Sequence, residues 1–195
     1  MYNNRKSFGD NMVENKITVT LAGKYRGPYF DRIKMLKNEL IENGIDVLYP
    51  PSGDMSDDSY GFFDSDKRTG DDKKDFRKAE LSFVHKTFLE CDAIIFCNFD
   101  GYLGKMTTNE LYLFSSLIAC NYDEKQNSNY NILNGYISIY LLEEVNIESF
   151  RTPDELGDFA TLLEYGMEKG LIKIGLKSFC EDFQSGQITK MKKKW

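Results

Sequence analysis

The chain has 195 residues, of which 41% are hydrophobic and 14% aromatic, so it can bury one sizeable core, and no compositional break requires a second domain. The formal charge of -6 and the pI near 5.0 exclude a general nucleic-acid-binding surface, which needs clustered cations. No apolar run approaches a membrane helix, the polar N-terminus lacks a secretory signal, and the four cysteines form no C-x-x-C pair. We therefore expect a cytoplasmic protein with reduced thiols.

Strand and helix patterns alternate along the first half of the chain. A β-branched run at 17–21 predicts a strand, and apolar residues with helical spacing predict a helix over 29–43. A second strand is expected at 45–49. Residues 52–78 are polar and acidic with few periodic apolar positions, which indicates a long loop.

The same alternation continues in the second half. The patterns predict helices over 79–90, 108–120 and 154–169, strands over 93–99, 137–142 and 171–176, and a surface loop over 121–135. Strands separated by helices are typical of a single flavodoxin-like or Rossmann-like α/β domain, with a parallel sheet of about five strands and helices on both faces. We expect this domain at 17–177, between a polar N-terminal extension at 1–16 and a C-terminal tail at 178–195.

The segment 91–110 predicts a buried strand, a glycine-containing turn and a helix start that carries Glu110. In open α/β sheets ligands bind at the carboxyl ends of the strands, so Glu110 falls where chemistry is often found. The spacing has a second interpretation. Thr107-x-x-Glu110 also matches a capping box, in which the two side chains satisfy each other's backbone amides.

The loop after the first strand is the second candidate. Here the amides at a helix N-terminus and the cations Lys24 and Arg26 could hold a phosphate or the 5′ end of a sugar. A plain turn is an equal alternative, because neither the Walker pattern nor G-x-G-x-x-G is present.

Together these motifs resemble the nucleoside 2-deoxyribosyltransferase-like superfamily. The resemblance is carried by Leu21-Ala22-Gly23, Cys91-Asp92-Ala93-Ile94-Ile95, Gly101-Tyr102-Leu103-Gly104 and Thr107-Thr108-Asn109-Glu110, in that order. It spans about 17–143 and is closest to a small branch with a Gly-Tyr-Ile-Gly-x-Ser-Thr-x-x-Glu signature. It implies a nucleoside or nucleotide ligand and a homo-oligomer. We expect no cofactor, and the charge and hydropathy of the chain argue against nucleic-acid and membrane partners.

The resemblance also implies roles for particular residues. Glu110 would be the carboxylate that attacks the anomeric carbon when an N-glycosidic bond is cleaved or exchanged. Asp92 would orient a hydroxyl, although it could equally cap the preceding helix. Aromatic rings near the first loop, Tyr29 among them, could stack on the base. The implied substrate-binding residues are Gly23, Lys24, Tyr25, Arg26, Phe30, Asn98, Asp100, Gly101, Tyr102, Gly104 and Thr107.

One position departs from the family pattern. In the characterised transferases an aspartate precedes the nucleophile by six residues, and Gly104 stands there in this chain. Asp100 could replace it only if the turn folds back. The alternative to an enzyme is therefore a non-catalytic or NAD-directed nucleotide sensor of TIR-like type, in a stress or antiviral response.

No metal site is predicted. His85 is the only histidine, and the acidic loop fails the calcium-loop template because Gly70 is out of place and no terminal glutamate follows.

Overall fold

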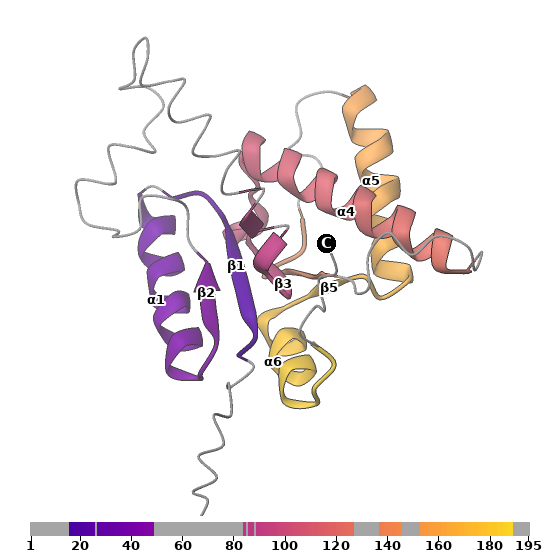
Figure 1. The fold of residues 1–195 in the computed structure, drawn as a ribbon. Helices are drawn as coiled ribbons and strands as arrows, with labels where there is room; N and C mark the ends of the chain where they lie inside the picture. The colour runs from indigo at the N-terminus through magenta and orange to yellow at the C-terminus, as the bar shows by residue number, and fades with distance from the viewer. Residues whose placement is uncertain are drawn as a thin grey trace, which may run out of the picture.

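A computed structural model describes residues 16–25, 27–48, 84, 86–87, 89–126, 137–145 and 153–188. Five parallel strands form one sheet in the order β2-β1-β3-β4-β5, the flavodoxin-like order, so the predicted α/β fold is confirmed (Figure 1). The strands are β1 (Thr18–Gly23), β2 (Asp46–Leu48), β3 (Ala93–Cys97), β4 (Ser138–Leu141) and β5 (Ile172–Ile174).

Helices cover both faces of the sheet (Figure 1). The helices are α1 (Pro28–Glu42), α4 (Lys105–Gln126), α5 (Pro153–Glu168) and α6 (Leu176–Gln184). Successive side chains of β3 point to opposite faces of the sheet and contribute to a separate apolar core on each face. Ile95 packs with residues of α1 and α6, whereas Ile94 and Phe96 pack with residues of α4 and α5.

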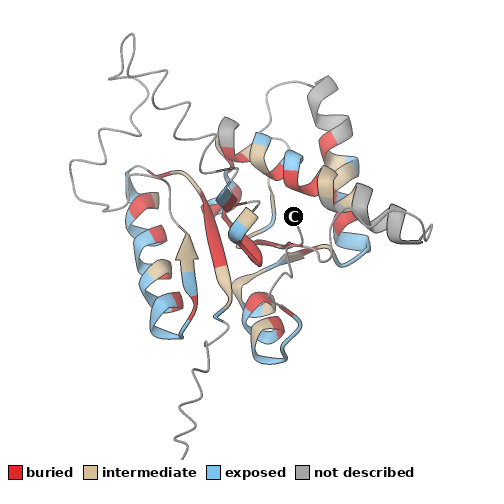
Figure 2. Ribbon diagram, viewed as in Figure 1, coloured by how far each residue is buried: buried red, intermediate tan, exposed pale blue. Residues whose placement is uncertain are grey.

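The centre of the sheet is apolar on both faces. All five residues of β3 are buried, and β3 pairs with β1 from Val19 opposite Ala93 to Gly23 opposite Cys97. Figure 2 shows the buried residues concentrated in these two strands and on the inner side of α1. Such continuous apolar strands are typical of a parallel sheet covered by helices on both sides.

Helix α1 begins and ends as its sequence predicts. Pro28 occupies its first position, where a missing amide costs nothing, and Gly27 precedes it with a left-handed φ of 59°. After Asn43, Gly44 takes a φ of 79°, which glycine adopts without strain. The helix buries one apolar stripe against the sheet, consisting of Phe30, Ile33, Leu36 and Leu40.

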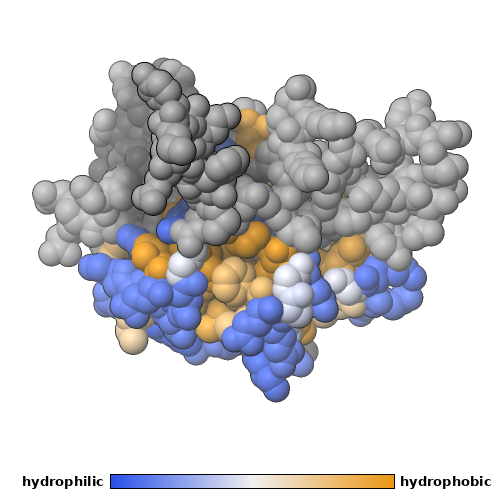
Figure 3. All heavy atoms as spheres, turned by 60° about the horizontal axis from the view of Figure 1, so that its bottom comes forward, coloured by the Kyte–Doolittle hydropathy of each residue, from blue (hydrophilic) through white to orange (hydrophobic). Residues whose placement is uncertain are grey.

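The outer surface contains both apolar and hydrophilic areas. In Figure 3, which brings the lower end of the molecule in Figure 1 forward, apolar residues gather in the middle of the face and hydrophilic residues flank them. None of the described helices combines the length and the apolar character that a membrane crossing requires.

Several predicted boundaries differ from those of the structure. Helix α4 begins at Lys105 instead of residue 108 and continues to Gln126, so the loop expected from residue 121 is helical in its first six residues. Helix α6 lies almost entirely within the expected C-terminal tail. Its apolar residues Leu176, Phe179 and Phe183 have helical spacing, so the sequence did contain the signal. The predictions for 1–15, for the loop at 52–78 and for His85 fall outside the described residues.

Candidate functional site

The carboxyl ends of β1 and β3 form the topological switch point of the sheet. From β1 the chain passes to β2 on one side and then returns to β3 on the other side. Because Gly23 and Cys97 are paired in register, the loops that follow them emerge at the same edge. In folds of this type the crevice at such an edge is the usual ligand site. We call this region the switch edge.

Helix α4 brings Glu110 to the switch edge. Because the helix begins at Lys105, Thr107 is its third residue and does not cap it, so the capping-box interpretation is wrong. Gly104 precedes the helix instead, and its carbonyl accepts hydrogen bonds from the amide and the hydroxyl of Thr108 at 2.8 and 3.1 Å. Glu110 lies in the second turn and is half-buried.

Tyr25 connects Glu110 to the first loop. Its ring is buried and its hydroxyl donates to the carbonyl of Leu21. Burial, followed by the charges of Cys97 and Glu110, raises the pKa of Tyr25 well above its usual value. Of these causes the charge of Glu110 is the smallest. Tyr25 itself belongs to the core of the α1 side and does not present an open stacking face.

Three rings form an aromatic column at the switch edge, made of Phe99, Tyr29 and Tyr102. The centroids of Tyr29 and Phe99 are 6.4 Å apart with an interplanar angle of 14°, and those of Tyr29 and Tyr102 are 6.2 Å apart at 24°. The ammonium of Lys24 lies 4.7 Å from the centroid of Tyr29 and 5.1 Å from that of Tyr102. Tyr102 is 41% exposed, so the outer end of the column is accessible to a planar ligand.

Arg32 packs against Phe99 at the opposite end of the column. Its guanidinium carbon lies 3.9 Å from the centroid of Phe99, and its two terminal nitrogens reach Asp100 at 3.4 Å and Glu143 at 3.6 Å. Asp100 adopts a left-handed φ of 59° in the short helix η2 (Phe99–Gly101), followed by Gly101 at 68°. The carboxylate of Asp100 is therefore paired with α1.

Other predicted binding residues hold the switch edge together. Asn98 is completely buried, and its side-chain amide donates to the carbonyl of Glu143 and accepts from the amide of Glu143 at 3.1 Å. Gly23 allows a close approach, because a Cβ there would lie 2.9 Å from the Cβ of Cys97. Phe30 is a core residue on the buried face of α1. These residues therefore stabilise the loops of the switch edge through hydrogen bonds and packing.

Asp92 lies at the other end of β3. Its carboxylate accepts a hydrogen bond from the amide of Thr18 at 2.8 Å, just before the two strands begin to pair. The structure therefore does not bring Asp92 together with Glu110. The predicted phosphate-binding Arg26 lies outside the described residues.

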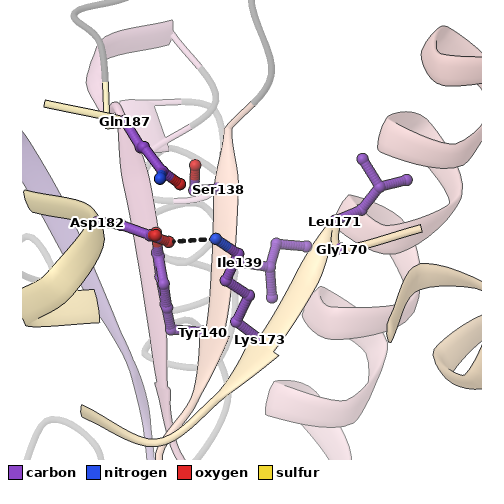
Figure 4. Close-up of a pocket in the computed structure, with 8 residues that line it drawn as sticks. All are labelled: Ser138, Ile139, Tyr140, Gly170, Leu171, Lys173, Asp182 and Gln187. Carbon is purple, nitrogen blue, oxygen red and sulfur yellow. Dashed lines mark hydrogen bonds and ion pairs between the residues drawn. The ribbon is translucent and has the colours of Figure 1, made fainter. Parts of the chain in front are cut away.

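A hollow that the sequence did not predict lies between β4, β5 and α6 (Figure 4). Its volume is about 80 Å³. One oxygen of the buried Asp182 accepts from the hydroxyl of Tyr140 at 2.6 Å and pairs with the ammonium of Lys173 at 2.6 Å. Burial, and then the hydrogen bond to Asp182, raises the pKa of Tyr140. The lining residues are Ser138, Ile139, Tyr140, Gly170, Leu171, Lys173, Asp182 and Gln187.

The fold and the switch edge together define a flavodoxin-like α/β protein with a half-buried carboxylate and an aromatic–cationic cluster at one edge. Within the described ranges, no group of three or more metal-ligating side chains converges. Comparison with known proteins matched no family model, no curated protein and no solved structure.

Proposed function

We propose that this protein binds a nucleoside or nucleotide at the switch edge and cleaves or exchanges its N-glycosidic bond, with Glu110 as the nucleophile. The observation that carries the proposal is the position of Glu110. It is a half-buried carboxylate in the second turn of α4, electrostatically coupled to Tyr25 from the loop after β1. The motifs shared with the nucleoside 2-deoxyribosyltransferase-like superfamily support the same residue.

Breaking an N-glycosidic bond develops positive charge on the sugar ring. A carboxylate below the anomeric carbon can stabilise this charge or form a glycosyl-enzyme intermediate. In the second case the Glu110 carboxylate forms a C–O bond to the anomeric carbon while the C–N bond breaks and the base leaves with the electron pair. Water would then release the sugar, or a second base would accept it. The aromatic column offers a stacking surface for the planar base.

The test is base release from a panel of 2′-deoxynucleosides, deoxynucleotides and NAD, followed by chromatography with and without an added acceptor base. We expect Glu110→Gln to lower the rate by more than about a thousandfold, as removal of a covalent nucleophile does. Glu90→Gln is the matched control, because Glu90 is an exposed carboxylate paired with Lys86. Absence of base release from every compound, with ligand binding unchanged in the Glu110→Gln protein, would sink the proposal.

A specific observation favours a binding protein without turnover as the second candidate. Gly104 provides no side chain, and the carboxylate of Asp100 is held by Arg32. A pocket lacking a second carboxylate near the sugar would retain affinity more readily than chemistry. Thermal stabilisation by a nucleotide without any release of base is the result that selects this candidate.

A further inference from the structure

The hollow between β4, β5 and α6, which we call the α6 hollow, lies away from the switch edge. Ser138 is the first residue of β4, and Gly170 and Leu171 directly precede β5. The hollow therefore lies near the amino ends of two parallel strands, whereas the switch edge lies at the carboxyl ends of β1 and β3. A ligand held in the α6 hollow is consequently independent of the ligand proposed for the switch edge.

Asp182 uses one of its two carboxylate oxygens within the described structure. Its side chain is 10% exposed, and Oδ2 accepts from the hydroxyl of Tyr140 and from the ammonium of Lys173, both at 2.6 Å. No described residue donates to Oδ1. This oxygen is not sealed off either, because the hydroxyl of Ser115 is the only sealed side-chain group without a partner in the described part of the chain. Since Asp182 lines the α6 hollow, Oδ1 is an acceptor that a bound molecule can reach.

Two neighbouring side chains supply the complementary groups. The ammonium of Lys173 has three protons, of which one goes to Asp182, and its side chain is 35% exposed. The amide of Gln187 extends toward Ser138 in Figure 4 and makes no hydrogen bond to the other lining residues drawn there. The α6 hollow thus combines a carboxylate oxygen, a cation and an amide that both donates and accepts.

The size and charge of the α6 hollow restrict what it can hold. Its volume is about 80 Å³, and one water molecule needs about 10–15 Å³ by the same measure. The space therefore suits several water molecules or one molecule of about five or six non-hydrogen atoms. A net charge on that molecule would be repelled by one member of the Asp182–Lys173 pair, whereas one charge of each sign satisfies both members.

We propose that the α6 hollow binds a small zwitterion, namely a free α-amino acid of the size of glycine or alanine. Its ammonium donates to Oδ1 of Asp182, and its carboxylate accepts from Lys173 and from the amide of Gln187. Charge-assisted hydrogen bonds then form at both ends of the molecule. Because these side chains come from β5, α6 and the segment after α6, the bound amino acid also strengthens the attachment of α6 to the sheet.

The experiment is an NMR titration of the full-length, ¹⁵N-labelled protein with glycine and with L-alanine. Betaine is a control that keeps both charges but has no N–H donor, and acetate and methylammonium each carry a single charge. At least one amino acid should shift the backbone amides around Lys173 and Gln187 and reach half-saturation at about 1–10 mM. Each control should require a concentration at least about tenfold higher.

Substitutions identify the groups that bind the amino acid. Gln187→Leu should weaken binding about tenfold, because the carboxylate loses a donor. This residue is exposed, and its side chain makes no hydrogen bond to the lining residues, so the fold is retained. Gln184→Leu is the matched control, because Gln184 is an exposed residue of α6 outside the lining. Asp182→Asn, which still offers Tyr140 an acceptor, should abolish binding in a protein with a native circular dichroism spectrum.

Three results would overturn the inference. They are the absence of saturable shifts with both amino acids up to about 50 mM, an equal response to betaine, and equal effects of Gln187→Leu and Gln184→Leu on affinity. The first result would mean that the α6 hollow holds only water. None of them bears on base release through Glu110, and Glu110→Gln should leave amino-acid binding unchanged, so the two proposals fail independently.

Discussion

Gly23 and Gly104, both at the switch edge, differ in how much space is available for a side chain. Gly23 is enclosed, because an added Cβ would lie 2.9 Å from the Cβ of Cys97 and 3.2 Å from the Cδ1 of Ile33. Gly104 is open, because the nearest atoms to an added Cβ belong to Tyr102 at 3.9 and 4.0 Å, and its φ lies outside the left-handed region. Two residues of the same type thus have opposite tolerance for a side chain.

We therefore expect Gly23→Ala to lower the free energy of unfolding by about 1–3 kcal/mol, the usual cost of overpacking. Gly104→Asp should leave it unchanged or raise it by up to about 1 kcal/mol, since aspartate is a favourable residue before a helix and restricts the unfolded chain. Urea unfolding followed by circular dichroism measures both. A destabilised Gly104→Asp protein would show that the turn before α4 has less room than the structure indicates.

At the scale of elements, a polar cluster and an aromatic contact add to the apolar packing that holds α6 on the sheet. Asp182 accepts a hydrogen bond from Tyr140 of β4 and forms an ion pair with Lys173 of β5. The ring of Phe179 packs edge-on against that of Tyr140, with 5.2 Å between the ring centroids. Buried groups that lose a partner keep their desolvation cost. The stability of α6 on the sheet therefore depends strongly on Asp182.

Asp182→Ala should lower the free energy of unfolding by about 3 kcal/mol, because it leaves Tyr140 and Lys173 without their shared acceptor. The same helix supplies the control. Glu181 pairs with Lys177 at its exposed surface, so Glu181→Ala should cost less than about 0.5 kcal/mol. Urea titrations of the two proteins give the comparison. Equal destabilisation by both substitutions would mean that the buried cluster adds nothing specific.

The sequence predicted the elements whose apolar period is strong, such as α1 and β3. It could not predict the contacts between distant side chains and backbone. Asn98 bonds to Glu143, 45 residues away, and Arg32 reaches Asp100, 68 residues away. Such partners depend on tertiary packing, which no local pattern encodes. For the same reason Tyr25 was predicted to stack on a ligand, although its hydroxyl donates a hydrogen bond to the backbone of the preceding strand, β1.

At the scale of the whole molecule, three buried acids couple stability to alkaline pH. Burial is the largest cause that raises the pKa of Tyr25, Cys97 and Tyr140, whose usual values are 10.0, 9.0 and 10.0. All three groups keep their protons in the folded state at a pH where the unfolded chain loses them. The unfolded state thus binds fewer protons above pH 9, and stability decreases as pH rises.

The free energy of unfolding should therefore be independent of the ionisation of these groups below about pH 8 and should fall as the pH rises above about 9. Tyr25→Phe should make the fall less steep, because its ring cannot ionise. Urea midpoints measured at intervals across this range provide the test. A Tyr25→Phe protein with the same alkaline slope as wild type would contradict the contribution assigned to Tyr25.

The pairing of β1 with β3 also determines when the protein can begin to fold. Thr18 and Asp92, which bond at the start of this pair, are 74 residues apart in the chain. During synthesis β1 must wait until β3 has emerged before the centre of the sheet can close, and β4 and β5 come later still. Closing such distant contacts costs chain entropy before packing repays it, so parallel sheets of this kind fold slowly. In a nascent or truncated chain the first strand is consequently left without its central partner, and unpaired strand edges favour aggregation.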